Sequence, residues 1–305
     1  MSALREAAFG RRPDLGVRVE PGTGAVDRWL VAVTLGGQGR YAAAATELGR
    51  LLADPAVPPA VAAHAAVTRA AHRRQQGGHA AARPDDALGL RLATAGPAGD
   101  PDADGTDAWA ARIDALVGLA ADAVGLGDPT TAARLLDVAE RAAEGHPSWR
   151  PRVRLGWVRA EHALLTGRAA DAVSRAGSAV ALAVAGGSVR HVLKSRIIHV
   201  VARGVAGDVG PADAIAALDA IGEDCDVLGL LPLRWPCALA AADLVTRLVD
   251  DHESLANDSV ARSAQRSPDD RSGGATRRRH AAASAMSVIG RRTDPRGKRL
   301  LGVSV

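Results

Sequence analysis

The stretch AVGLGDPTTAARLLDVAERAAEGHP, residues 123–147, has the pattern of one helix between two turns. It opens with a Gly-Asp-Pro turn, continues with Leu and Ala at helical spacing, and closes with Gly145 and Pro147. Apolar residues three and four apart predict a helix with one buried face, and glycine supplies the positive φ that ends a helix. The stretch contains no nucleophile motif, phosphate loop or metal cluster. The stretch therefore bears on the fold of the chain, but it narrows the function only to a broad class and identifies no specific activity.

The same pattern recurs along the chain. A glycine ends one helix and a second helix rich in small residues follows at Gly39, Gly78, Gly127, Gly167 and Gly207. The intervals are 39, 49, 40 and 40 residues, and the long interval contains a polar insertion at 96–107. A fixed period with one loop insertion is typical of an array of repeated helical hairpins.

Each unit is predicted to hold two helices. We expect first helices at 25–36, 59–76, 107–124, 150–165 and 189–205, and second helices at 41–53, 79–94, 129–144, 169–185 and 211–221. Alanines such as Ala132 and Ala172 lie where neighbouring helices must approach closely. A further helix at 231–256 is predicted to cap the stack, with Pro232 and Pro236 limiting where it begins.

Composition favours the same all-α class. The chain has 305 residues, of which 47% are hydrophobic and only 2% aromatic. Alanine is the commonest apolar residue, whereas the β-branched and aromatic runs typical of sandwiches and barrels are scarce. We expect two buried, reduced thiols at Cys225 and Cys237, because they form no CxxC pair. The N-terminus has no apolar segment typical of a signal peptide, so a cytoplasmic protein without a membrane span is expected.

Several of these features resemble the tetratricopeptide repeat family over residues 25–222. They are the Gly39-Arg40-Tyr41 turn, the recurring alanines and the closing Pro55. The resemblance implies a right-handed α-solenoid of about five hairpins with a concave groove lined by the first helices. The period near 40 is longer than the usual unit of this family. Gly156 and Arg196 stand where the family usually has a large apolar or aromatic residue.

The chain changes character toward its C-terminus, which suggests three parts: an extension at 1–24, the helical repeats at 25–256 and a basic tail at 257–305. Residues 262–305 carry eleven basic and three acidic residues, a net charge of +8 against +4 for the whole chain. Few large apolar groups predict a disordered tail, apart from a short helix at 280–290. The tail either has no specific ligand, contacts nucleic acid or an acidic partner, or lies on a membrane surface. The residues for a nucleic-acid contact are Arg277, Arg278, Arg279, Arg291 and Arg292.

The resemblance also implies a binding surface in the concave groove. It turns Arg154, Trp157 and Glu161 of one first helix, and Lys194 of the next, toward that groove. Arg190 lies one turn before Lys194 and shares its face. Tryptophan and arginine dominate binding hot spots, so these five residues are the predicted partner site. The alternative is that the tryptophan belongs to the core and the cations are only solvated.

Motifs that carry chemistry are scarce. The sequence holds no Walker phosphate loop, HExxH, CxxC pair or GxSxG. Asp100, Asp102, Asp104 and Gly105 resemble half of a calcium loop, but the twelfth position is Ala111 where a glutamate is needed. We expect an acidic loop there, weak calcium binding being the alternative, with Asp107 capping the next helix. We expect neither a metal nor a cofactor.

These observations predict a non-enzymatic interaction module that binds a peptide or protein partner in the groove. One alternative is a transcription-associated regulatory protein whose basic tail contacts nucleic acid. Another is an enzyme whose acid–base groups lie in the groove. The sequence does not identify the partner, the pathway or the oligomeric state.

Overall fold

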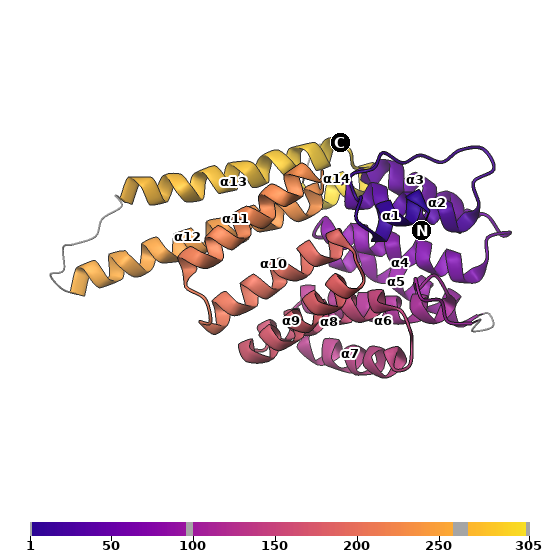
Figure 1. Cartoon of the computed structure of the whole chain (residues 1–305), viewed down its shortest axis with the longest axis horizontal. Helices are drawn as coiled ribbons and strands as arrows, with labels where there is room; N and C mark the ends of the chain where they lie inside the picture. Colours follow the sequence, from indigo (N-terminus) through magenta and orange to yellow (C-terminus); the bar gives the residue numbers. More distant parts are fainter. Residues whose placement is uncertain (1, 96–99, 259–267, 303–305) are drawn as a thin grey trace.

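The computed structural model describes residues 2–95, 100–258 and 268–302 (Figure 1). Every regular element in these ranges is a helix, fourteen in all, and none is a strand. The all-α prediction is therefore confirmed. No helix within the described ranges has both the length and the apolar composition needed to cross a membrane.

Ten of the helices form five consecutive hairpins. The first helices of the pairs, here called the inner helices, are α2 (Ala25–Gly37), α4 (Pro59–Gln75), α6 (Ala108–Gly125), α8 (Trp149–Leu165) and α10 (Val189–Ala206). Their partners, the outer helices, are α3 (Tyr41–Ala53), α5 (His79–Thr94), α7 (Pro129–Ala143), α9 (Ala169–Ala185) and α11 (Pro211–Val227). These bounds match the predicted ones within two residues, except that α11 continues six residues further.

The turn glycines mostly take the predicted left-handed conformation, as at Gly127 (φ 72°) and Gly167 (φ 73°). In the second hairpin the positive φ belongs to Gly77, at 79°, and not to the predicted Gly78. Gly78 is needed for a different reason. A Cβ at Gly78 would lie 2.5 Å from a methyl carbon of Leu300, which packs on this turn from the far end of the chain.

Small residues allow the helices to pack closely. Each inner helix contacts its outer partner and also the next inner helix, from α2 to α10. Ala132 and Ala172, predicted at helix crossings, are fully buried. The long helix α12 (Leu231–Asp258) continues the array after α11, and the two share a core that contains both Cys225 and Cys237.

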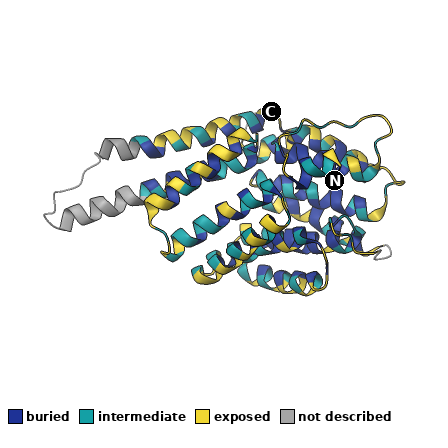
Figure 2. Cartoon of the chain, in the orientation of Figure 1, coloured by how far each residue is buried: buried dark blue, intermediate teal, exposed yellow. Residues whose placement is uncertain are grey.

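The array also closes on itself, which the sequence did not predict. The backbone N–H of Val189, at the start of α10, donates to Gly10 O at 3.1 Å. The guanidinium of Arg190 donates to Val33 O of α2 at 3.2 Å. Residues 29–37 of α2 are all buried, because α1, α3 and α4 pack on this helix and Arg190 of α10 reaches it (Figure 2).

A short N-terminal helix, α1 (Ala3–Phe9), lies at this closure. Phe9, the only phenylalanine, packs 5.7 Å from Trp29 of α2 and 6.3 Å from His191 of α10, between ring centroids. His191 in turn lies 5.0 Å from Trp149 and 5.4 Å from Trp157. Four of the seven Phe, Trp and Tyr residues of the chain thus gather around His191, where the first and last hairpins meet.

The predicted disorder of the tail is wrong for residues 268–302. This segment forms α13 (Pro268–Arg291), which packs along α12, and α14 (Pro295–Leu300) (Figure 1). Ala282, Ala285 and Ile289 are buried, and Ile289 approaches the Gly39 turn. Asp294 pairs with the buried Arg73 of α4 at 2.7 Å. Composition could not show this, because the surface that orders the segment comes from residues far away in sequence.

Candidate functional site

The structure brings four of the five predicted site residues together on the facing sides of α8 and α10. The Lys194 ammonium lies 4.4 Å from the centroid of a Trp157 ring, a cation–π contact. Trp157 itself is buried, and its indole N–H donates to Ser195 Oγ at 2.7 Å. Arg154, Glu161 and Lys194 are half-buried. Arg154, Trp157 and Lys194 each contact a residue of the same chain.

Arg154 belongs to a buried ionic group with Asp114 of α6. Its Nη1 lies 2.8 Å from Asp114 Oδ1, while Arg150 Nη1 donates to Asp114 Oδ2 at 2.5 Å. Burial by itself raises the pKa of Asp114, but the two guanidinium groups hold it below the usual value. Burial, together with the repulsion of Arg150, lowers the pKa of Arg154. One carboxylate thus neutralises part of two buried positive charges.

A second ionic group has the opposite imbalance. Arg74 of α4 donates to Asp86 of α5 and lies 3.2 Å from Asp122 of α6. Two carboxylates therefore share one guanidinium. Burial and the negative charge of Asp122 raise the pKa of Asp86 to about 7, although Arg74 opposes this shift. Burial raises the pKa of Asp122 to about 6. These two groups are called the inner ionic layer, comprising Arg74, Asp86, Asp114, Asp122, Arg150 and Arg154.

Glycine makes room for this layer at Gly118 of α6. A Cβ built there would lie 2.3 Å from Asp86 Oδ1. The neighbouring Asp86 side chain is fully buried. A larger residue at this position would displace the carboxylate from Arg74 or separate the helices.

Arg190, the fifth predicted residue, lies near the other four but makes its hydrogen bond to the first hairpin. It bonds to Val33 O of α2, and a Cβ at Gly37 would lie 2.7 Å from its Nη1. Burial and the nearby arginines Arg154 and Arg150 lower its pKa to about 10. Arg190 therefore fastens the last hairpin to the first.

Burial also dominates the titration of the remaining inner pair. It lowers the pKa of Lys194 and raises the pKa of Glu161, and each of the two opposes the shift of the other. The predicted concave site is thus a set of half-buried charges around a buried tryptophan. The structure places Trp157 in the core, as the alternative interpretation expected, and the cations of this set are half-buried.

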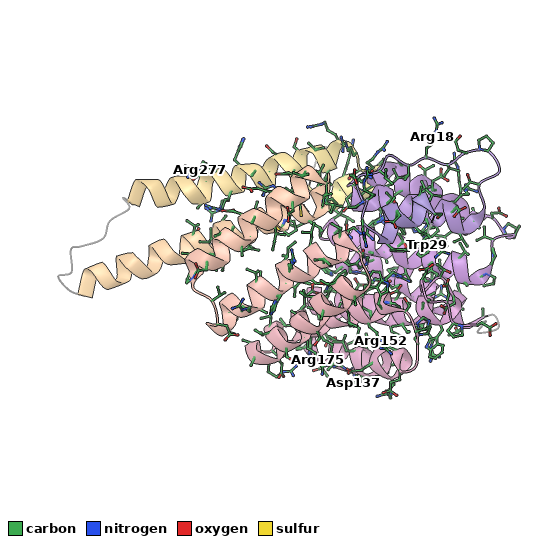
Figure 3. The ribbon with its side chains drawn as sticks, viewed as in Figure 1. Arg18, Trp29, Asp137, Arg152, Arg175 and Arg277 are labelled. Atoms are coloured by element: carbon green, nitrogen blue, oxygen red, sulfur yellow. The ribbon has the colours of Figure 1, made fainter. Side chains whose placement is uncertain are left out.

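A recess does exist on the opposite side of α8. It has a volume of about 270 Å³. It is bordered by α7, α8 and α9, and we call it the outer groove. Its lining residues are Glu140, Ala143, Glu144, Arg152, Leu155, Gly156, Arg159, Arg175, Ser178, Ala179 and Leu182. Figure 3 shows Arg152, Arg175 and Asp137 gathered at this edge of the array.

The floor of the outer groove is made of small residues. A Cβ at Gly156 would lie 3.1 Å from the Cβ of Ala179. Gly156 is the position at which the sequence departs from the tetratricopeptide pattern by lacking a large side chain. That departure is the sequence signal for the groove, although it was interpreted only as a break in the repeat.

The rim of the outer groove is charged. Arg159 contacts Asp137 at 2.8 Å and Glu140 at 2.5 Å, and Arg175 contacts Glu140 at 3.1 Å. Arg152 is exposed and makes no ion pair with any residue whose side chain the structure describes. The groove therefore combines a small-residue floor with one cation that remains available to an acidic group.

A second recess of about 380 Å³ lies nearby, between α6 and α7. Five residues border it: Trp109, Arg112, Val138, Arg141 and Ala142. It has walls from two helices only, whereas the outer groove is bounded by three. The outer groove is therefore better suited to hold a side chain on several sides.

The acidic loop before α6 has a structural role. Asp107 caps the helix as predicted, accepting from Ala110 N at 2.8 Å, and also accepts from His146 at 3.1 Å. Asp102 accepts from Asp104 N at 2.8 Å, and Asp104 pairs with Arg5 of α1. Across the described ranges, no three His, Cys, Asp or Glu side chains are grouped in a way that could hold a metal ion.

The predicted nucleic-acid residues separate into two kinds. Arg278 of α13 pairs with Asp219 of α11, so its charge is neutralised. Arg277, Arg279, Arg291 and Arg292 are exposed. Arg279 donates to Thr246 Oγ1 at 2.9 Å, and Arg291 donates to Ser287 Oγ at 2.8 Å.

No protein-family model and no curated protein sequence matches the chain. The likeness to tetratricopeptide repeats therefore stays a prediction based on the turn glycines, the alanines and the hairpin period.

Proposed function

We propose that the chain is a non-enzymatic, tetratricopeptide-like interaction module that binds a peptide segment of a protein partner in the outer groove. The observation that supports this is the combination of the Gly156–Ala179 floor with the exposed Arg152. The recess is open to solvent, and Leu155 and Leu182 contribute apolar surface to it. The inner surface is a weaker candidate, because its charges already contact one another.

The groove chemistry defines the peptide. One apolar side chain, leucine or an aromatic residue, lies over Gly156, where its burial supplies most of the binding free energy. An acidic residue next to it pairs with Arg152. Arg159 and Arg175 are held by Asp137 and Glu140, so they form a fixed rim and contribute less to affinity.

Selection from a displayed random-peptide library tests this proposal. Ser178→Trp introduces an indole from the exposed rim of the groove and is expected to prevent binding without disturbing the core. Ser174→Trp is the matched control, because Ser174 is exposed one turn earlier on α9 and does not line the groove. Enriched peptides should carry an apolar residue beside Asp or Glu and bind wild type and Ser174→Trp equally.

Two results would contradict the proposal. One is that the library yields no binder to the wild-type chain. The other is that enriched peptides bind Ser178→Trp as tightly as wild type, which would place the site elsewhere. Arg152→Glu supplies a second measurement, because it should abolish the preference for acidic peptides and leave the helical circular dichroism unchanged.

A further inference from the structure

The docking of the C-terminal helices creates a cationic surface that neither end of the chain has alone. The backbone N–H of Ala42, at the start of α3, donates to Arg292 O at 2.8 Å. This contact places the exposed Arg40 beside the end of α13. Arg296 Nη2 donates to Ala81 O of α5 at 3.3 Å. The assembled surface, here called the basic corner, consists of Arg40, Arg291, Arg292, Arg296, Lys298 and Arg299.

The basic corner has almost no internal compensation. All its members are exposed except the half-buried Lys298, and none makes an ion pair with a residue whose side chain is described. Asp294, the acidic residue within this segment, is committed to the buried Arg73 through contacts of 2.7 and 2.8 Å. Some exposed arginines elsewhere, such as Arg12, Arg168 and Arg175, each pair with a carboxylate. Those without an ion pair to a described side chain, such as Arg152, lie singly on other helices, whereas the corner gathers six cations on one surface.

The corner is also held in a fixed geometry. Arg73 forms a two-point contact with Asp294, Gly297 N donates to Asp294 Oδ1 at 2.7 Å, and Leu300 packs against the Gly78 turn. The backbone that carries the cations is therefore anchored to α3, α4 and α5. Fixed cations lose less conformational entropy on binding than cations on a disordered tail.

The cationic surface continues along α13. Arg277 and Arg291 are both exposed and are fourteen residues apart, which places them on the same side of the helix about 21 Å apart. Arg277 is labelled on α13 in Figure 3. The ridge from Arg277 to Arg299 is thus long enough to contact several phosphates of a duplex.

We infer that the basic corner binds the phosphate backbone of duplex nucleic acid without sequence preference. The exposed large apolar side chains identified in the described part of the chain lie on other helices and their turns, outside the corner. Insertion into a membrane surface or docking of a hydrophobic peptide uses such side chains, whereas purely electrostatic binding to anionic lipid is distinguished by the vesicle competition below. The corner also offers no exposed aromatic residue on which unpaired bases could stack, since Tyr41 beside Arg40 is buried, and this favours a duplex over a single strand. This inference is independent of the peptide-binding proposal.

Fluorescence anisotropy with a labelled duplex DNA, measured over a series of salt concentrations, tests the inference. Each phosphate contact contributes about −0.9 to the slope of log K against log salt. The triple variant Arg40→Gln, Arg292→Gln, Arg299→Gln should therefore reduce the magnitude of that slope by about 2.7. The corresponding triple Arg→Lys variant should keep the wild-type slope, because it keeps the charges.

The matched control removes the same charge elsewhere. Arg112, Arg141 and Arg196 are exposed on α6, α7 and α10, and their replacement by Gln should leave the slope unchanged. Equal losses in the two Gln variants would overturn the inference, since binding would then follow net charge alone. It would also be overturned if wild type fails to bind the duplex at low salt, or if anionic vesicles or polyglutamate compete as well as DNA. If the triple Gln variant of the corner loses helical circular dichroism, Arg299→Gln alone is measured instead. Its slope of log K against log salt should be smaller in magnitude by about 0.9.

Discussion

The two faces of α8 carry the same types of residue with opposite consequences. On the inner face, Arg150 and Arg154 are packed against Asp114 and contribute to the closure of the array. On the outer face, Arg152 and Arg159 border a recess open to solvent. The difference arises from the neighbours: α6 and α10 cover the inner face, whereas α7, α8 and α9 border an open recess on the outer face, with α9 packed closely on Gly156. An arginine of α8 therefore stabilises the fold where neighbouring helices cover it, and is accessible to a partner where they do not.

The largest expected effect comes from removing the central carboxylate of the inner face. Asp114→Ala leaves the buried Arg150 and the half-buried Arg154 without a counter-charge, and should destabilise the fold by about 3–5 kcal/mol. Asp137→Ala removes the exposed carboxylate that contacts Arg159 on the outer face, and should cost about 0–1 kcal/mol. Urea unfolding followed by circular dichroism measures both. Similar losses in the two variants would contradict the contrast between the faces.

A smaller effect is expected where α9 packs on its neighbours. Ala172 is fully buried among small residues, so Ala172→Leu should destabilise by about 1–3 kcal/mol through overpacking. Ala170 is exposed on the same helix and is the control, since Ala170→Leu adds the same methyl groups in solvent. If urea midpoints for Ala172→Leu and Ala170→Leu coincide, the tight crossing is not present.

The inner layer also predicts a pH dependence of stability. Burial and Asp122 raise the folded-state pKa of Asp86 to about 7, from 3.8 in the unfolded chain, so the folded state binds the proton more tightly. The contribution of Asp86 to the free energy of unfolding is fully present below the unfolded-state pKa of 3.8. It is lost as the pH rises toward the folded-state pKa of about 7. The buried His64 and His72 have lowered pKa values of about 4 and about 3, and they change stability in the opposite direction.

The difference between wild type and Asp86→Asn isolates the carboxyl, because the histidines are common to both. The free energy of unfolding of wild type should fall relative to Asp86→Asn as pH rises through this window. A difference that stays constant with pH would show that Asp86 titrates normally. Arg74, Asp122 and Arg154 face the same carboxyl and are unchanged in the comparison.

The smallest expected effect belongs to the outer face. Arg152→Gln removes an exposed cation with no described carboxylate partner, so the unfolding free energy should change by less than about 0.5 kcal/mol. Thermal unfolding without a selected acidic peptide measures the stability of the free variant, and unfolding with the peptide measures how much its binding stabilises the chain. The variant should melt like wild type when free and gain less stability from the peptide. A large loss of stability in the free variant would mean that Arg152 also has a structural role.

Sequence reasoning located the helices of the hairpins well, because alanine-rich periodicity and turn glycines are local signals. The family resemblance placed Arg154, Trp157, Glu161 and Lys194 on one surface, and their role in binding a partner stays a prediction. Sequence reasoning missed the burial of these residues and the closure by Arg190, which contacts Val33 at a separation of 157 residues. It missed the outer groove as well, because the missing side chain at Gly156 has meaning only beside Ala179.

The amino-acid sequence by itself determined where most helices of the five hairpins begin and end and that they pair, since propensity, capping and glycine conformation act within a few residues. Only the tertiary structure decided that α10 meets α2, that Phe9 packs between them, and that the C-terminal segment folds against α3, α4 and α5. These features depend on side chains distant in the chain, such as Arg73 with Asp294. Their free energy comes from burial and charge pairing after the array has brought those residues together, and no local pattern records that event.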